Sequence, residues 1–225
     1  MNNSVINVAI DGPGGAGKST SARAAAKELG YIYVDTGALY RAVGVNALRK
    51  NIDTKDKAAV AASIAGISVD LVFENGEQKV LLNGEDVSVE IRTPPASMAA
   101  SDVSAVPEVR AFLFDLQRDI ASRNNCIMDG RDIGTVVLPD AQVKIFLTAS
   151  AEERVQRRFK ELQAKGSTVS FQSVLDELIE RDYNDSHREI APLKPAEDSV
   201  LLDTTGVSLE EQVAKIINII KEKVQ

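Results

Sequence analysis

The chain has 225 residues, of which 44% are hydrophobic and 26% charged, as in a soluble globular protein with one well-cored domain and insertions. Its formal net charge of -7 argues against nonspecific nucleic-acid binding, which requires a basic surface. No apolar run approaches the roughly 18 residues that span a membrane, so we expect neither a nucleic-acid nor a membrane partner. One cysteine and no apparent secretory signal favour a reducing compartment, and we expect a cytoplasmic monomer.

The first chemical motif is the glycine-rich run at residues 11–20, directly after the apolar stretch 5–10. It fits the pattern GxxxxGKS, in which glycines let successive backbone N–H groups point at phosphate oxygens. Lys18 adds a point charge, and the Ser19 hydroxyl can ligate the Mg²⁺ that accompanies a nucleotide. A plain turn between a strand and a helix is the weaker alternative. The predicted triphosphate-binding residues are Gly12, Pro13, Gly14, Gly15, Ala16, Gly17, Lys18, Ser19 and Thr20.

Short apolar runs without strict alternation predict the buried strands of a parallel sheet. These runs lie at residues 5–10, 32–34, 126–128, 143–147 and 200–202. Predicted helices alternate with them, at residues 19–29, 38–50, 108–123, 151–165, 171–185 and 209–223. This alternation predicts an α/β fold with right-handed crossovers.

Residues 67–89 interrupt the alternation, between predicted helices at 55–65 and 96–103. Strand-like runs there are separated by two Asn-Gly pairs, Asn75-Gly76 and Asn83-Gly84. Asn-Gly favours the tight turn of a β-hairpin, so a small antiparallel β insert is predicted.

Polar residues follow the second strand, in the segment Asp35-Thr-Gly-Ala-Leu-Tyr-Arg41. Ligands of open α/β sheets bind at the carboxyl ends of the strands. Arg41 could clamp a phosphate with two hydrogen bonds, and Tyr40 offers an aromatic face or a hydroxyl. The alternative is a capped helix start, with Thr36 as the cap and Tyr40 packed inward.

A second charged segment, residues 128–134, follows the strand at 126–128. Asp129 at the end of this strand can hold the hydration shell of magnesium, and Arg131 and Asp132 would point into the cleft. A solvated loop with internal ion pairs is the alternative.

The helix predicted at 151–165 carries Val155, Phe159 and Leu162 on one face and arginines on the other. It could equally be an ordinary solvated helix with ion pairs four residues apart. For His187, the single histidine, we favour a polar helix-end position, because a phosphate monoester is already anionic at neutral pH and needs no base. Cys126, in an apolar run, is interpreted as a small buried hydrophobic residue.

Together these motifs resemble the bacterial cytidylate kinases, a family of P-loop nucleoside monophosphate kinases. The resemblance covers nearly the whole chain and rests on the phosphate loop, 35–41, Glu90-Ile-Arg92, 129–137, and 181–185 with Arg188. It implies a five-stranded parallel sheet of order 2-3-1-4-5. It also implies three parts: a core at 1–36, 104–149 and 190–225, an NMP-binding domain with the β insert at about 37–103, and a lid with its adjoining helix at about 150–189.

The resemblance implies in-line transfer of the γ-phosphoryl group of ATP to CMP, and also to dCMP, with Mg²⁺. The implied CMP-binding residues are Thr36, Tyr40, Arg41, Ser101, Arg110, Arg131, Asp132, Arg181, Asp185 and Arg188. The implied catalytic residues are Lys18, Arg131, Arg154, Arg157 and Arg158. Magnesium would be held by Ser19 and, through water, by Asp129.

Within the CMP set, the resemblance divides the work among base, phosphate and sugar. The cytosine ring would be recognised by Ser101, Arg110 and Asp132. The phosphate would be held by Arg41, Arg131 and Arg188. The sugar hydroxyls would contact Arg181 and Asp185. This is chemically consistent, since a carboxylate accepts from the cytosine amine and an arginine donates to the ring acceptors.

Two other functions stay open on the residues alone. One is a kinase for another small acceptor, such as UMP or shikimate, and the other is a non-catalytic ATP-binding switch. A GTPase is excluded, because the chain has no NKxD element to recognise guanine.

Overall fold

The structure is a computed structural model and describes residues 5–74, 77–164 and 166–224. A parallel sheet with the strand order β2-β6-β1-β7-β8 lies at its centre. Its strands are β1 (Asn7–Asp11), β2 (Ile32–Asp35), β6 (Cys126–Gly130), β7 (Val143–Thr148) and β8 (Val200–Asp203). Counted within this sheet alone the order is 2-3-1-4-5, so the predicted fold and strand order are confirmed.

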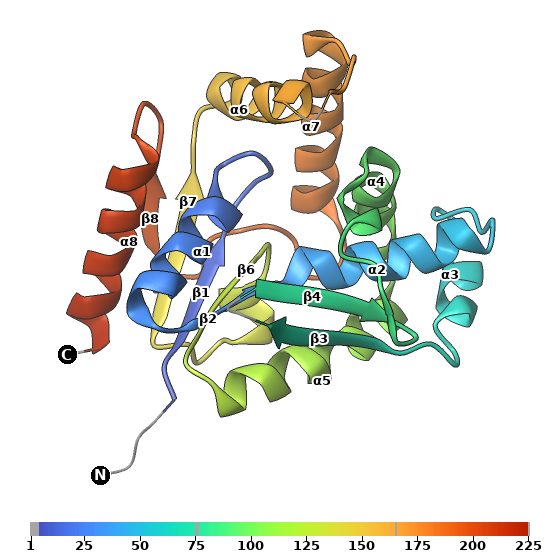
Figure 1. Cartoon of the computed structure of the whole chain (residues 1–225), viewed down its shortest axis with the longest axis horizontal. Helices are drawn as coiled ribbons and strands as arrows, with labels where there is room; N and C mark the ends of the chain where they lie inside the picture. Colours follow the sequence, from blue (N-terminus) through green and yellow to red (C-terminus); the bar gives the residue numbers. More distant parts are fainter. Residues whose placement is uncertain (1–4, 75–76, 165, 225) are drawn as a thin grey trace.

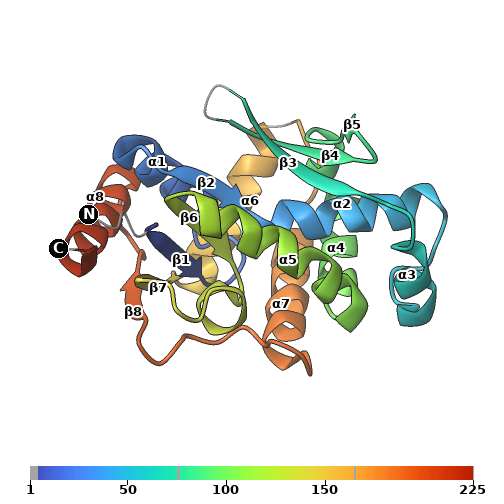
Figure 2. The ribbon, with the colours of Figure 1, turned by 90° about the horizontal axis from the view of Figure 1, so that it is seen from below.

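Helices cover the sheet on both faces and extend beyond it (Figure 1). They are α1 (Lys18–Leu29), α2 (Thr36–Arg49), α3 (Lys57–Ser63), α4 (Pro94–Val103), α5 (Pro107–Arg123), α6 (Ala151–Ala164), α7 (Phe171–His187) and α8 (Leu209–Val224). Alanines of α1 and isoleucines of α8 pack on one face of the sheet, and Ile120 and Ala121 of α5 pack on the other. Figure 2 shows α1 beside α8. Lys165, the last residue of one predicted helix, lies outside the described residues.

A second, antiparallel sheet is formed by β3 (Val69–Glu74), β4 (Glu77–Leu82) and β5 (Glu85–Asp86). Asn83 and Gly84 turn the chain from β4 to β5 with φ of 53° and 80°, the left-handed conformation for which Asn-Gly is suited. The second predicted turn, Asn75-Gly76, lies outside the described residues. Val69, Val80 and Leu82 of this sheet pack with residues of α2 and α4 in one apolar cluster.

The start of α2 differs from the alternative in which Thr36 caps this helix. Asp35 is the cap: its carboxylate accepts from the Ala38 N–H at 3.0 Å, and Thr36 is already the first helical residue. A carboxylate at this position satisfies a backbone donor that has no partner inside the helix. Residues Ile133–Val137 form a π-helical turn that the sequence did not predict.

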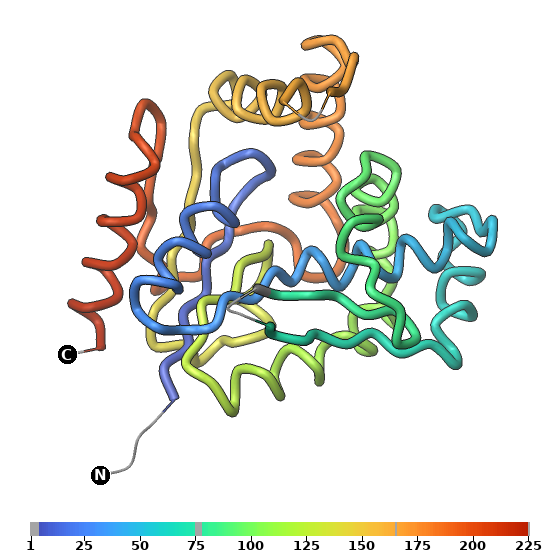
Figure 3. The backbone as a smooth tube through the Cα atoms, viewed as in Figure 1, coloured from blue at the N-terminus to red at the C-terminus, as the bar shows by residue number. Residues whose placement is uncertain are grey.

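Helices α6 and α7 lie beyond the carboxyl ends of the parallel strands (Figure 3). They share a small apolar cluster of Val155, Leu162, Val174 and Leu178. The loop between β1 and α1 lies against both helices, because a Cβ at Gly15 would come within 2.9 Å of the Arg154 carbonyl and one at Gly14 within 3.4 Å of Leu178.

Strand register brings three carboxylates to the same edge of the sheet. Asp11 lies opposite Gly130 across β1 and β6, and Asp35 lies opposite Asp129 across β2 and β6. Parallel strands end at a common edge, so residues far apart in sequence converge there. Within the part of the chain that the structure describes, no helix is long and apolar enough to cross a membrane.

Candidate active site

A cavity of about 710 Å³ opens at this edge and collects most of the predicted site residues. Those that line it are Gly14, Gly15, Gly17, Lys18, Ser19, Thr20, Thr36, Tyr40, Arg41, Ser101, Asp129, Arg131, Asp132, Arg157, Arg158, Arg181, Asp185 and Arg188. The predicted residues outside this lining are Gly12, Pro13, Ala16, Arg110 and Arg154. We call the part of the cavity at the β1–α1 loop the donor end, and the part at Asp132 the acceptor end.

At the donor end, the β1–α1 loop requires its glycines. Gly12 has a φ of 149°, and a Cβ there would lie 1.9 Å from the Leu147 carbonyl oxygen. Gly17 caps α1 in the left-handed region, with a φ of 94°. Lys18 is buried and donates from Nζ to the Pro13 carbonyl at 2.8 Å. Burial and then the neighbouring charge of Arg131 lower the pKa of Lys18 to about 7.

Asp129 joins the donor end to the second strand. Its carboxylate accepts hydrogen bonds from the Ser19 hydroxyl and from the Tyr33 hydroxyl, each at 2.8 Å, and its carbonyl accepts from Thr36 Oγ1. Burial and then the charge of Asp35 raise the pKa of Asp129. The two predicted metal-binding side chains are therefore in direct contact, and Tyr33 is a partner that the sequence did not indicate.

At the acceptor end, Asp132 is buried between two arginines. It forms an ion pair with Arg110, and Arg188 Nη2 lies 3.2 Å from its Oδ1. Arg110 also lies over the Tyr40 ring, 5.7 Å from the ring centroid. Side chains from α2, α5 and the end of α7 therefore meet around Asp132.

Two further ion pairs complete the acceptor end. Arg131 Nε lies 2.6 Å from Asp185, and Arg41 Nη2 lies 2.7 Å from Asp35. Burial disfavours the charged form of Asp35, but Arg41 and the Ala38 amide outweigh burial and lower the pKa of Asp35. The loop after β6 is thus ion-paired across the cleft, and its alternative interpretation as a solvated loop is wrong.

Several polar atoms at this end are buried without a hydrogen-bond partner among the described residues. They are Arg41 Nε, Ser101 Oγ and Arg181 Nε. Arg181 also has its pKa lowered to about 10, by burial and then by the charge of Arg131. Unpaired donors beside a cavity are costly unless a bound molecule supplies acceptors.

The arginines of α6 differ in their surroundings. Arg154 is buried, donates to the Gly14 carbonyl at 2.9 Å and pairs with Asp182 at 2.6 Å. Arg157 donates to the Ala16 carbonyl at 3.1 Å and to the Thr204 carbonyl at 2.8 Å. Arg158 pairs with the exposed Glu161 at 3.0 Å. Of the acidic partners of these arginines, Glu161 is the most exposed to solvent, so Arg158 can exchange its partner most easily.

Sequence reasoning left several charged residues of this site out of the predicted set, among them Asp11 and Arg92. Asp11, at the end of β1, accepts from the Ile133 and Gly134 N–H groups at 2.8 and 2.7 Å, and burial raises its pKa to about 6. Arg92 lines the cavity in the short helical turn Glu90–Arg92. Signals for both existed, because Asp11 stands at a strand end and Arg92 in a motif that carried the family resemblance.

His187 and Cys126 lie away from the chemistry, as expected. His187 is exposed at the end of α7 and stacks on Tyr183, with the ring centroids 4.2 Å apart. Cys126 is fully buried in β6, and burial raises the pKa of its thiol to about 12. A buried thiol with so high a pKa is a packing residue at neutral pH.

Comparison with known proteins places the whole chain in one family. The model of the cytidylate kinase family matches residues 8–222. A cytidylate kinase from Carboxydothermus hydrogenoformans is 51% identical over 218 residues, covering 97% of this chain and 98% of that protein. One from Caldicellulosiruptor saccharolyticus is 50% identical over 214 residues and one from Pasteurella multocida 46% identical over 222, with at least 95% of each chain covered.

Solved structures agree on the fold alone. An uncharacterized protein from Eubacterium ventriosum superposes with a TM-score of 0.53 at 12% identity, covering 96% of this chain and 98% of that one. A gluconokinase from Sinorhizobium meliloti superposes with a TM-score of 0.50 at 13% identity, covering 97% and 93%.

Proposed function

The chain belongs to the cytidylate kinase family, whose reaction phosphorylates CMP with ATP, and we propose how its residues carry out this reaction. The observation that carries the proposal is Asp132, buried at the acceptor end between Arg110 and Arg188. A carboxylate held in this way can accept from the exocyclic amine of cytosine, where uracil presents a carbonyl. We further propose that dCMP is a second acceptor.

ATP would bind at the donor end with its phosphates on the backbone N–H groups of residues 12–20. Lys18 would exchange its hydrogen bond to the Pro13 carbonyl for contacts with the β and γ phosphates. Burial lowers the pKa of Lys18, and the negative phosphates would raise it again by favouring the charged amine. Arg154 and Arg157 would hold the loop through its carbonyls, and Arg158 would reach the transferring group.

CMP would bind at the acceptor end, with its base at Ser101, Arg110 and Asp132. Its phosphate would be held by Arg41, Arg131 and Arg188, and its sugar hydroxyls by Arg181 and Asp185. The unpaired Ser101 hydroxyl and the unpaired Nε atoms of Arg41 and Arg181 support this assignment, because the nucleotide has oxygens to offer each of them. Tyr40 and Thr36 would line the same pocket.

Transfer would then need little covalent help from the protein. The CMP phosphate is already a nucleophile at neutral pH, so no general base is assigned. Lys18, Arg131 and Arg158 would neutralise charge that spreads over the moving phosphoryl group, and the two ends of the cavity would hold the reacting oxygens in line.

The residues present fit a magnesium ion bound with the triphosphate. The Ser19 hydroxyl and the Asp129 carboxylate, 2.8 Å apart at the cavity wall, are oxygen donors of the kind that magnesium prefers. Ser19 would bind the ion directly and Asp129 through water, and the bound ion would supply positive charge to the phosphate oxygens.

Water is a competing nucleophile, so productive transfer requires closure around both substrates. The proposed moving parts are the NMP-binding region at about 37–103 and the lid with its adjoining helix at about 150–189, against the core at 1–36, 104–149 and 190–225. A reducing cytoplasmic location and a monomer complete the proposal.

Initial rates with ATP and a panel of CMP, dCMP, UMP and AMP test donor, acceptor and base recognition together. We expect CMP and dCMP to be phosphorylated well and UMP and AMP poorly. Equal rates with UMP would contradict the role of Asp132, and ATP loss without CDP formation would contradict the phosphotransfer itself.

A further inference from the structure

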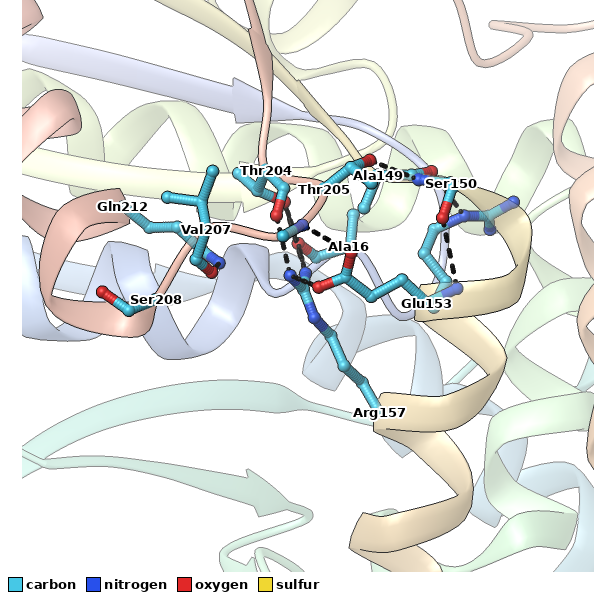
Figure 4. A network of polar contacts seen from close by, with 12 residues as sticks. Ala16, Ala149, Ser150, Glu153, Arg157, Thr204, Thr205, Val207, Ser208 and Gln212 are labelled. Carbon is cyan, nitrogen blue, oxygen red and sulfur yellow. Dashed lines mark hydrogen bonds and ion pairs between the residues drawn. The ribbon is translucent and has the colours of Figure 1, made fainter.

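Glu153 lies in the first turn of α6 and is bonded both to Arg157 of the same helix and to the segment that follows β8 (Figure 4). Its Oε2 accepts from the Gly206 N–H at 2.7 Å, and its Oε1 pairs with Arg157 Nη2 at 2.5 Å. The side chain is 27% exposed, so it lies partly shielded from water. One carboxylate thus bridges a backbone donor and a cation.

Arg157 extends this bridge to the β1–α1 loop. The same Nη2 that meets Glu153 donates to the Thr204 carbonyl, and Nη1 donates to the Ala16 carbonyl (Figure 4). Thr204 is fully buried, and its hydroxyl is bonded to the carbonyl of Thr148 at 2.9 Å. The residues between β8 and α8, which we call the β8–α8 connection, are therefore tied to the phosphate loop through α6.

This connection and the start of α8 form a wall of the donor end. Val207, Leu209 and Gln212 line the cavity together with Glu153 and Arg157. Gln212 donates to the Val207 carbonyl at 2.9 Å, and a Cβ at Gly17 would lie 3.2 Å from Gln212 Oε1. The wall starts where the phosphate loop ends, so the nucleoside part of a donor seated on that loop would lie against it.

We propose that Glu153 is a positioning residue for the donor nucleotide, acting through Arg157 and Gly206. The inference rests on the proposed function for the identity of the donor. Without the carboxylate, Arg157 loses its counter-charge and the Gly206 amide loses its acceptor. The β8–α8 connection would then have to be ordered by the bound nucleotide, and ordering costs affinity. Among the described residues, the hydrogen bonds and ion pair of Glu153 do not reach the acceptor end, so CMP binding would be unchanged.

The test compares Glu153→Gln and Glu153→Ala with Glu152→Gln as the matched control. Glu152 is exposed in the same first turn of α6, so its change removes the same charge from the helix terminus without touching the bridge. We expect the KM for ATP and the Kd for ADP to rise about tenfold in Glu153→Gln and further in Glu153→Ala, as for a lost charge-assisted hydrogen bond. The KM for CMP should stay within about twofold of the wild-type value, as should both constants in the control.

Other outcomes would overturn the inference. Unchanged ADP and ATP constants in both variants would show that the bridge does not position the donor. An equal rise for ATP and CMP would show a general structural role. Because Glu153→Gln keeps the shape of the side chain, it carries the test if Glu153→Ala does not fold. Failure of the wild-type protein to form CDP would contradict the proposed function instead, and ADP binding would still decide the role of Glu153.

Discussion

The two ends of the cavity present different chemical groups to a ligand. The phosphate-binding part of the donor end is made by one contiguous segment, residues 12–20, through its backbone N–H groups and glycine conformations. The acceptor end is made by charged side chains that come from distant parts of the chain, paired as Arg110 with Asp132, Arg131 with Asp185 and Arg41 with Asp35. Backbone recognises phosphate in any nucleotide, whereas placed side chains can distinguish one base from another.

The difference extends to what each end must do when a ligand arrives. At the donor end Lys18 exchanges a hydrogen bond to the neutral Pro13 carbonyl for an ionic contact with a phosphate. At the acceptor end buried guanidinium groups must share or exchange carboxylate partners, and a buried ion pair that loses one member is strongly destabilised. Selectivity should therefore be concentrated at the acceptor end, and charge neutralisation of the transferring group at the donor end.

The largest effect is expected from Lys18→Met, which breaks the donor end alone. Turnover should fall by roughly 10²-fold to 10³-fold, because a positioned charge next to the transferring group is lost. The Kd for CMP should change little, since the CMP phosphate is held by arginines. Steady-state kinetics and calorimetry with CMP measure the two quantities. Lys27→Met, an exposed change on the same helix, is the control. Comparable turnover in Lys18→Met would refute the donor-end assignment.

The next effect is expected from Asp132→Ala, which breaks the acceptor end alone. The preference for CMP over UMP should fall by roughly 10-fold to 100-fold, the discrimination that one well-placed base contact provides. The KM for CMP should rise, since Arg110 and Arg188 lose their shared partner, while the KM for ATP should hold. The ratio of kcat/KM for CMP and UMP checks this, with the exposed Asp115→Ala on α5 as control. An unchanged ratio would remove Asp132 from base recognition.

The same contrast explains what the sequence could predict. The phosphate loop is local, so its pattern gave Gly12, Lys18 and Ser19 without any knowledge of the rest of the fold. The parallel strands were equally accessible, because a strand buried on both faces is continuously apolar over a short run. Asp129 was predicted because it ends such a strand.

The contacts of the acceptor end could not be predicted from local sequence patterns. Arg110 lies in the middle of α5 and pairs with Asp132, 22 residues later in the chain, and no periodicity in the sequence indicates that contact. The family resemblance supplied it. Tyr33 was missed for the same reason, since its hydroxyl contacts Asp129, 96 residues later in the chain. The hydrogen bonds of Asp35 to Gln78 and of Glu153 to Gly206 also join residues distant in sequence. The alternative interpretation placed Thr36 at the cap of α2, because threonine and aspartate are both favoured at that position.

The affinities for ATP and CMP should depend differently on pH, which distinguishes the donor end from the acceptor end. The pKa of Lys18 is lowered to about 7, so its charge is present below that pH and is lost above it. In the absence of CMP, the affinity for ATP should therefore fall with rising pH between about 7 and 9, by at most tenfold per unit. The affinity for CMP should fall less, because arginines stay charged over this range. Calorimetry at several pH values measures both, with Lys18→Arg as the control, in which the slope for ATP should disappear. A flat ATP profile in the wild-type protein would contradict the lowered pKa.

The smallest effect is expected from Gln78→Ala, which tests whether the β insert supports the acceptor end. Gln78 on β4 accepts from the Asp35 N–H at 2.8 Å and donates to the Asp35 carbonyl at 3.3 Å, on the free edge of β2. Asp35 in turn holds Arg41. Each neutral hydrogen bond contributes about 1 kcal/mol, and only part of that loss reaches Arg41, so the KM for CMP should rise about threefold to fivefold. The exposed Asp70→Ala on β3 is the control within the same sheet. Within the described ranges, the side-chain hydrogen bonds of Gln78 go to Asp35 and not to residues 12–20. An equal rise in the KM for ATP would therefore show that the two ends are mechanically coupled through β2 and are not independent.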